Sequence, residues 1–448
     1  MAKVSDKEKL LSTIGMEPRS KDHLQQVKQE LQVEELLGLG LWIDGTPFNW
    51  DRTESLEIVS FNLPGVEGKF KNLRIPCTVI PKGWVATGET FDDILELIVW
   101  SLQHLALGIH PARRHDKKDW MPGDDVRRAR AKSPLRIKAC LVEVRGDWLM
   151  MKEVFHLPAW NELAGCCWLC KATPDNIRNA AAGAPWRDDR LSHWELVQRI
   201  LEKGFELSPL LSAPGIKSDC FKIDWLHAVD QGVAADFLGN LLKLLCSKMV
   251  GANNKEKRKA LFGEIKQHYA QHDVQEQLQT LTAGMIQAKK APPKLRAKAA
   301  EVRALIPFAK SASDRFLSDA EPVEKAAKEM AKHLNTLYGT LSGQCIFRQD
   351  LMQNHCNKFC LLYAGLEEVF KDKPGRNWRI KPKFHLMQEL CEMTEGSNPA
   401  LSWTYRDEDF GGSMATMTRQ KGGKNTVYGV SHRLVSRFRA KHDFPAIS

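Results

Sequence analysis

The sequence predicts an α/β fold in which a mixed β-sheet with flanking helices is interrupted by a large all-helical insertion. Three observations predict it. Short β-rich runs separated by Pro and Gly stand between residues 40 and 80, and their alternation of apolar and polar residues favours strands. An amphipathic helical pattern and a further β-rich run follow. Residues 230–370 are then rich in Ala, Lys, Glu and Leu, which favour helix.

Length and composition indicate a folded protein of two or three domains. The chain has 448 residues, of which 43% are hydrophobic, and a domain takes roughly 100–200 residues. Lys and Arg number 65 against 55 Asp and Glu, a net charge of +10. This surplus favours an anionic polymer as partner, because basic groups that bind phosphates release counterions. A mildly basic protein with no such partner has the same balance.

Three further patterns indicate where the protein is located. Residues 1–15 are charged throughout and lack the apolar segment of a secretory signal. The apolar stretch 94–110 is interrupted by polar residues and is too short to span a bilayer. Eleven cysteines without a regular framework indicate a reducing compartment. The sequence therefore predicts no membrane association and a location in the cytoplasm or nucleus.

The first elements are a helix and three strands. Apolar residues recur at helical spacing over 20–37. The runs 40–48, 55–63 and 72–80 are predicted strands bounded by Gly and Pro turns. Pro76 in the third run indicates an edge strand or a bulge.

A helix with clear ends follows these strands. Thr90 is a candidate N-cap, apolar residues then repeat at helical spacing, and Gly108 closes the helix. After a basic loop, 135–149 is a predicted fourth strand. Three β runs, a helix and a fourth strand form the opening topology of an RNase H-like fold, which several other α+β folds share.

Two aspartates stand at strand ends. Asp44 ends the first predicted strand and Asp147 ends the fourth. The first and fourth strands are neighbours in an RNase H-like sheet, so the two carboxylates are expected to converge at one edge. Carboxylates held close need a cation, and Mg²⁺ (or Mn²⁺) suits hard oxygen ligands. The alternative is that both aspartates belong to ordinary turns.

A third acid is expected from the C-terminal tail. The densest acidic cluster there is Asp-Glu-Asp at 407–409. Glu408 is the predicted third acid, with Asp407 in reserve. The alternative is that these acids only interact with a helix dipole.

One CxxC motif offers half a zinc site. Cys167 and Cys170 need two further ligands, and Cys220 and His227 are chemically suitable candidates. The alternative is a pair of buried cysteines beside a hydrogen-bonded histidine.

The tail also carries a basic motif ahead of a predicted helix. Lys381, Lys383 and His385 are candidates for contacts with a nucleic-acid phosphate backbone. Otherwise His385 lies near the metal site, or the motif is a solvated loop.

Taken in order, these motifs resemble the DDE transposases of the CACTA/En-Spm group and its relatives, including the Kyakuja–Dileera–Zisupton type. The resemblance covers roughly residues 38 to 430. It is carried by DGTPF (44–48), NLPG (62–65), an aspartate ahead of a CxxC, DWLHAVDQGVAADFLGNLL (224–242) and KPKFHLMQEL (381–390).

The resemblance implies a role for each motif. It implies Asp44 as the first catalytic acid and Asp147 as the second, and a catalytic Glu after the KPK-H motif. The family's CxxC is matched by Cys167 and Cys170, and its D-x-x-H by 224–227. Asp147, however, stands in an Arg-Gly-Asp-Trp setting where the family usually shows an Asp-Phe-Pro-like one, which leaves Asp224 as the alternative second acid.

The sequence as a whole predicts a nuclear protein that cleaves and rejoins DNA strands by divalent-metal-dependent phosphoryl transfer. The alternatives are an inactive, transposase-derived scaffold that binds DNA or protein, and a zinc-stabilised interaction protein. No DNA-binding module is recognisable before residue 38, so a truncated or domesticated copy is expected, and self-association is left open. The predicted parts are a lead-in helix (1–37), the first part of the core (38–165), a CxxC/DxxH connection (166–228), a helical insertion (229–375) and the last part of the core (376–448).

Overall fold

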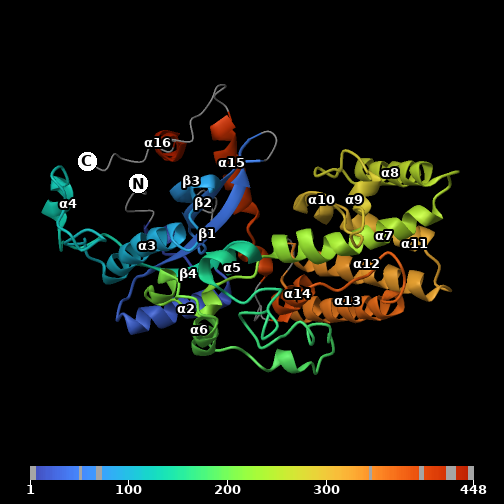
Figure 1. The fold of residues 1–448 in the computed structure, drawn as a ribbon, viewed down its shortest axis with the longest axis horizontal. Coiled ribbons are helices and arrows are strands. Elements are labelled where there is room, and N and C mark those ends of the chain that lie inside the picture. The colour runs from blue at the N-terminus through green and yellow to red at the C-terminus, as the bar shows by residue number, and fades with distance from the viewer. Residues whose placement is uncertain are drawn as a thin grey trace. The chain divides into compact units, whose positions relative to one another are not determined.

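A computed structural model describes residues 7–49, 53–66, 73–342, 346–392, 398–419 and 430–441 (Figure 1). The chain forms two compact units, each assembled from segments distant in sequence. Unit 1 comprises Met1–Ala159, Leu191–Asp224 and Leu401–Ser448, and unit 2 comprises Trp160–Arg190 and Trp225–Ala400. Within the described ranges, no helix is both long and apolar enough to cross a membrane.

Unit 1 contains a mixed four-stranded sheet, which confirms the predicted α/β class. The strands are β1 (Leu37–Pro47), β2 (Ser55–Asn62), β3 (Arg74–Pro81) and β4 (Ala139–Arg145). Their order is β3-β2-β1-β4. The three N-terminal strands pair antiparallel, and β4 runs parallel to β1. The strand predicted over 135–149 is shorter than expected, because Asp147 already caps a helix that follows β4. The first residue of the run predicted over 72–80 lies outside the described residues.

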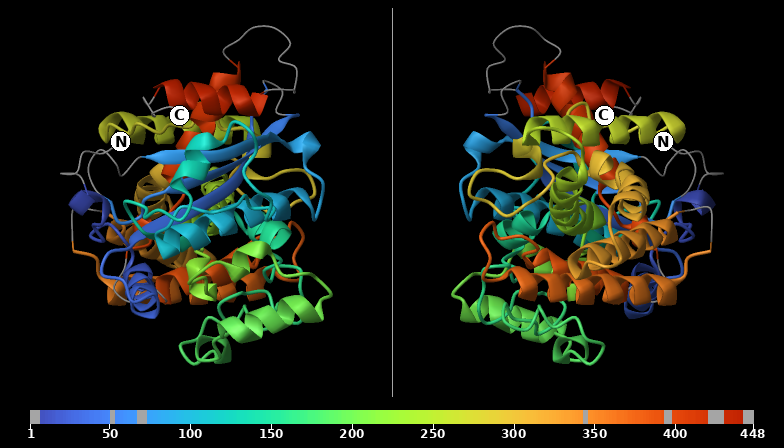
Figure 2. Two further views of the ribbon diagram at one scale, coloured as in Figure 1. Left: turned by 90° about the vertical axis from the view of Figure 1, so that its left-hand side faces the viewer. Right: turned by 90° about the vertical axis from the view of Figure 1, so that its right-hand side faces the viewer.

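One face of the sheet is covered by α15 (Tyr405–Arg419) and α16 (Val430–Lys441). Figure 2 shows these helices, in red, on the opposite side of the sheet from α3. They pack on the sheet through an apolar cluster of strand and helix residues: Trp42, Leu56, Ile58, Val79, Met414, Leu434 and Phe438. At Gly411 the helix comes so close that an added Cβ would lie 2.6 Å from the Thr46 hydroxyl.

The predicted helix after β3 is α3 (Thr90–Leu107). Its apolar stripe is buried, and Gly108 closes it in a left-handed conformation with φ of 73°, which glycine adopts without strain. Thr90 is the first helical residue rather than the N-cap, and its hydroxyl accepts a hydrogen bond from the Ala86 amide at 2.9 Å. The remaining unit 1 helices are α1 (Lys7–Leu10), α2 (Pro18–Glu30), α4 (Asp125–Arg130), α5 (Trp148–Phe155) and α6 (His193–Glu202).

Unit 2 is helical and packs around buried aromatic side chains. Phe237, Phe359, Tyr363 and Trp378 contact one another edge-on or tilted, arrangements that suit aromatic quadrupoles. The unit begins its longer segment with a π-helix, η7 (Leu226–Ala234). Eight α-helices follow in the described residues: α7 (Ala235–Lys248), α8 (Asn254–Gln271), α9 (Ala283–Ile286), α10 (Ala299–Ala304), α11 (Ile306–Phe316), α12 (Pro322–Thr340), α13 (Gln349–Phe370) and α14 (Lys383–Glu392).

The observed boundaries differ from the predicted helical segment 229–375. Unit 2 extends to Ala400 and also takes in Trp160–Arg190. The CxxC motif and the KPK-H motif, far apart in sequence, are therefore parts of the same helical unit.

Candidate active site and metal centre

The carboxyl ends of β1 and β4 bring two of the predicted acids into register. Trp42 pairs with Arg145 at the end of the parallel ladder, so two more residues along each chain lead to Asp44 and Asp147. Between them, an added Cβ on Gly146 would lie 2.9 Å from the Ile43 carbonyl oxygen. A glycine at 146 therefore lets the two chain segments run side by side up to their aspartates.

A further aspartate, Asp224, reaches this region beside β4. Phe221 forms an isolated parallel bridge with Val144, and the Lys222 amide donates to the Val144 carbonyl at 2.9 Å. Asp224 follows two residues later and is buried. Three neighbouring chain segments thus each carry an aspartate near this edge of the sheet, although β1 continues past Asp44 to Pro47.

Local hydrogen bonds orient these aspartates. Oδ1 of Asp44 accepts from the Gly45 amide at 2.6 Å. Oδ1 of Asp147 accepts from the Met150 amide at 2.6 Å and caps α5. Both oxygens of Asp224 accept from Thr404, one from its amide and one from its hydroxyl, each at 2.9 Å. Asp224 therefore anchors the residue just before α15.

Helix α15 carries the predicted third acid, and adjacent acids on it have different partners. Asp407 is fully buried and forms ion pairs with Arg74 and Arg145. This corrects the reserve assignment of Asp407, because a carboxylate that neutralises two buried arginines is not available to a metal ion. Glu408 instead faces the strand-end aspartates.

Glu408 lies among carboxylates. Burial, together with the charges of Asp224, Asp407 and Asp147, raises its pKa to about 7, against a lowering effect of its hydrogen bond with Asp44. Carboxylate oxygens of Asp44 and Glu408 lie within 4.8 Å of one another. Like charges held this close favour a shared proton or a bound cation.

A second cluster lies inside unit 2. Cys167 and Cys170 meet two residues one turn apart on α14, His385 and Glu389, and all four are buried. Sγ of Cys170 is 3.2 Å from Nε2 of His385, and Sγ of Cys167 is 3.9 Å from Oε1 of Glu389. Nε2 of His385 is 3.4 Å from the same oxygen of Glu389.

Ionised forms are favoured at three members of this cluster, whereas the hydrogen bond with Cys167 and then burial raise the pKa of the fourth, Cys170. Burial opposes charge at Cys167, but hydrogen bonds from Cys170 and His385 lower its pKa to about 6. Burial likewise opposes charge at His385 and Glu389. The charge of Cys167 nevertheless raises the pKa of His385 to about 9, and His385 together with Arg190 lowers that of Glu389 to about 2. The Arg190 guanidinium contacts both Glu389 oxygens, at 3.1 and 3.0 Å.

The other predicted zinc ligands are not in this group. Cys220 belongs to unit 1, where its Sγ lies 3.4 Å from Nε2 of His23. His227 is in η7, and its carbonyl accepts from Nζ of Lys383 at 2.7 Å. The CxxC is thus grouped with His385 and Glu389, rather than with Cys220 and His227.

The KPK-H residues have partners within unit 2. Nζ of Lys381 is 2.6 Å from Asp236, and Lys383 binds the His227 carbonyl. His385 has an exposure of 0%. This burial corrects the expectation that His385 contacts a phosphate backbone.

Sequence reasoning missed Glu389. A usable signal exists, because His385 and Glu389 are four residues apart in a predicted helix, and such residues share a face. The roles of Arg74 and Arg145 had no comparable signal, since their shared partner Asp407 is distant in the chain.

No protein-family model matches this chain, and no curated protein has a significantly similar sequence.

Proposed function

We propose that unit 1 is an RNase H-like catalytic core that cleaves and joins DNA strands by divalent-metal-dependent phosphoryl transfer, as a DDE transposase does. The sheet order β3-β2-β1-β4 supports this, because it sets the first and fourth strands side by side, with Asp44 in the last part of β1 and Asp147 just after β4. Unit 2 interrupts unit 1 in sequence, which fits an insertion into such a core.

The observation that carries the proposal is the environment of Glu408. Its pKa is raised to about 7 by burial beside other carboxylates. Folding such a group against Asp44 costs stability unless a cation offsets the charge. Carboxylate oxygens are the donors that Mg²⁺ and Mn²⁺ prefer. Asp44, Glu408 and Asp147 would hold the ions, with Asp224 as the alternative to Asp147.

The chain's own residues set the geometry. Ions bound here supply Lewis-acid stabilisation of the phosphate oxygens in an in-line displacement. Asp224 fixes the start of α15 through Thr404, and Asp407 fixes its rotation through Arg74 and Arg145. Glu408 is thereby held towards Asp44 before substrate arrives, which is the positioning that phosphoryl transfer requires.

We further propose that the second cluster holds a structural Zn²⁺. Two thiolates, one imidazole and one carboxylate are a suitable donor set. Donor separations of 3.2, 3.4 and 3.9 Å suit four ligands at about 2.0–2.3 Å from one ion. Arg190 would orient Glu389 from outside the ligand set, as outer partners of metal ligands do. The ion would tie the CxxC segment to α14.

A strand-cleavage assay tests the catalytic proposal. The full chain is incubated with supercoiled plasmid and Mn²⁺ or Mg²⁺, and nicked and linear products are measured on gels. We expect metal-dependent nicking that Asp44→Asn and Glu408→Gln each reduce by at least about 100-fold. Asp409→Asn is the matched control, because Asp409 is exposed on the same helix.

Direct metal binding gives a readout independent of activity. Mn²⁺ titration followed by electron paramagnetic resonance should show binding that Asp44→Asn weakens and Asp409→Asn leaves unchanged. Mn²⁺ binding without cleavage would favour the inactive scaffold. Equal Mn²⁺ binding by Asp44→Asn and Asp409→Asn would contradict a metal site at Asp44 and Glu408. The proposed function also includes a location in the nucleus and association of the chain with copies of itself.

A further inference from the structure

We propose that a cavity between α3 and the basic segment 109–133 of unit 1 binds one unpaired nucleotide of single-stranded DNA. The base would occupy an aromatic end and the phosphate an arginine-lined end. This inference rests on the proposed function, since it assigns a contact to the DNA that unit 1 would act on.

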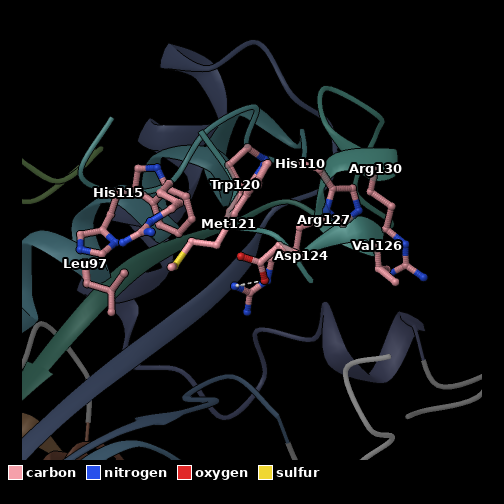
Figure 3. A pocket seen from close by; sticks show the side chains of 12 residues that line it. Leu97, His110, His115, Trp120, Met121, Asp124, Val126, Arg127 and Arg130 are labelled. Atoms are coloured by element: carbon pink, nitrogen blue, oxygen red, sulfur yellow. Dashed lines mark hydrogen bonds and ion pairs between the residues drawn. The ribbon is translucent and has the colours of Figure 1, made fainter. Parts of the chain in front are cut away.

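The cavity is formed by α3 and by the segment that returns to β4, which includes helix α4. It has a volume of about 570 Å³, within the ~300–1,000 Å³ typical of small-ligand sites. Figure 3 shows Leu97 and His115 towards one end in this view and Arg130 and Val126 towards the other. Trp120, Met121 and the Arg127–Asp124 ion pair lie between them. The lining is therefore largely aromatic and apolar, with Arg130 at one end.

Aromatic side chains build the first end. The rings of Trp100 and Trp120 meet edge to face with centroids 6.3 Å apart, and Trp100 meets His115 in the same way at 6.3 Å. Trp120 is 9% exposed. Within the part of the chain that the structure describes, its indole N–H has no hydrogen-bond partner. A buried donor normally finds an acceptor, and a nucleotide offers several.

Arginines supply the positive charge of the lining. Arg130 lies at the second end, Arg127 lies against Trp120, and Arg114 pairs with Asp116 at 3.0 Å. Arg127 lies 3.4 Å from Asp124 and 5.5 Å from the centre of the Trp120 ring. No carboxylate pairs with Arg130 among the described residues. The segment 109–133 holds eight Lys or Arg against four Asp, so its local field favours an anion.

The aromatic rings and the arginines of the cavity together favour a nucleotide as its ligand. A flat ring that stacks on Trp or His and an adjacent phosphate that arginine can bind are what a nucleotide presents. In a duplex the base faces are already stacked on their neighbours, so an unpaired nucleotide enters this cavity more readily. The predicted preference is for single strands over duplex.

Binding of a fluorescein-labelled dT12 strand, followed by fluorescence anisotropy without added divalent metal, tests the inference on the full chain. Arg130→Ala should weaken binding roughly fivefold to tenfold through the lost phosphate contact. Trp100→Leu should weaken it roughly tenfold through lost stacking. Arg128→Ala is the control, because Arg128 lies on the same helix, pairs with Asp125 and does not line the cavity.

A second measurement uses the unmodified chain, so that the inference can still be tested if a variant fails to fold. A dT12 strand carrying one 5-iododeoxyuridine is cross-linked by light to the unmodified chain, and the labelled peptide should contain Trp100 or Trp120. Equal affinity of Arg130→Ala and Arg128→Ala, together with cross-links elsewhere, would overturn the inference. Tighter binding of a duplex or of the matching RNA strand would overturn it too.

The two proposals fail separately. Asp44→Asn should leave binding of dT12 at this cavity unchanged while it removes cleavage. Absent cleavage with intact, cavity-dependent binding counts against the catalytic proposal alone. If the wild type cleaves DNA but the cavity variants bind dT12 as tightly as the wild type, only the cavity proposal is contradicted.

Discussion

Nη1 of Arg145 lies 3.5 Å from Oδ2 of Asp407, which joins the last residue of β4 to the first turn of α15. The same carboxylate pairs with Arg74 at the start of β3. Because Asp407 is fixed from both sides, its neighbour Glu408 is turned towards Asp44. Two adjacent acids therefore have opposite roles, one structural and one available for a metal ion.

Substitution of each acid should separate these roles. Asp407→Asn removes the carboxylate that pairs with two buried arginines, Arg74 and Arg145, although Arg145 keeps its ion pair with Glu143. We expect it to lower the free energy of unfolding by about 3–5 kcal/mol. Glu408→Gln removes a buried charge next to carboxylates, and at pH 8 without divalent metal we expect a gain of ~1 kcal/mol. Urea unfolding of both variants measures the difference. Equal losses of stability would show that Glu408 is also structural.

Two neighbouring glycines of α15 offer a matched test of its packing on β1. An alanine Cβ at 411 would meet the Thr46 hydroxyl at 2.6 Å, whereas at 412 nothing lies within 4 Å. Gly411→Ala should destabilise the protein by about 1–3 kcal/mol, and Gly412→Ala should stabilise it by ~0.5–1 kcal/mol, because alanine favours helix. Thermal melting distinguishes them. Similar melting temperatures for the two variants would argue against this packing of α15.

Zinc content tests the second cluster. We expect about one Zn²⁺ per purified chain by elemental analysis, and its loss in Cys167→Ser and in His385→Gln. Cys166→Ser should retain the ion, because Cys166 is equally buried but donates to the Ala172 carbonyl instead. A chelator should lower the melting temperature of the wild type and have little effect on the two metal-free variants. Metal retained by His385→Gln would exclude His385 as a ligand.

A histidine pair in unit 2 predicts a pH dependence of stability. Nδ1 of His333 on α12 and Nδ1 of His355 on α13 are 2.9 Å apart. Burial is the first cause that lowers both pKa values below the ordinary 6.5, and the charges of Lys358 and Lys332 lower both further. The charge of His355 also lowers the pKa of His333, against an opposing effect of Glu329. The unfolded chain then binds more protons, so stability is present above pH ~6.5 and is lost as the pH falls below it.

The slope of melting temperature against pH between 7 and 5 measures this effect. His355→Gln should make the slope shallower. His432→Gln should not, because His432 is exposed on α16. Identical slopes for the wild type and His355→Gln would show that the pair does not control it.

Elements set by local sequence were predicted well. The positions of β1, β2 and α3 follow from alternation, helical spacing and the closing Gly108, and all are confirmed. The length of β4 was wrong, since the cap at Asp147 is a hydrogen bond to Met150 that the strand pattern conceals.

Features that depend on distant segments were not predictable in the same way. Asp44 and Asp147 could be expected to converge because strand pairing carries them. The partners of Cys167 are set by helix α14, more than two hundred residues later in the numbering, and no local rule gives that packing. The engagement of Asp407 by Arg74 likewise joins segments far apart in the chain.

The division of unit 1 into three chain segments has a consequence for biosynthesis. Asp44 leaves the ribosome early, whereas Glu408 emerges only after all of unit 2 has been made. At ~5–20 residues per second, the interval is roughly 20–70 s. Asp147 and Asp224 are added during this interval, and Glu408 comes last of the four acids. A product that terminates before residue 408 would therefore lack the complete acidic group, and with it the metal site proposed above.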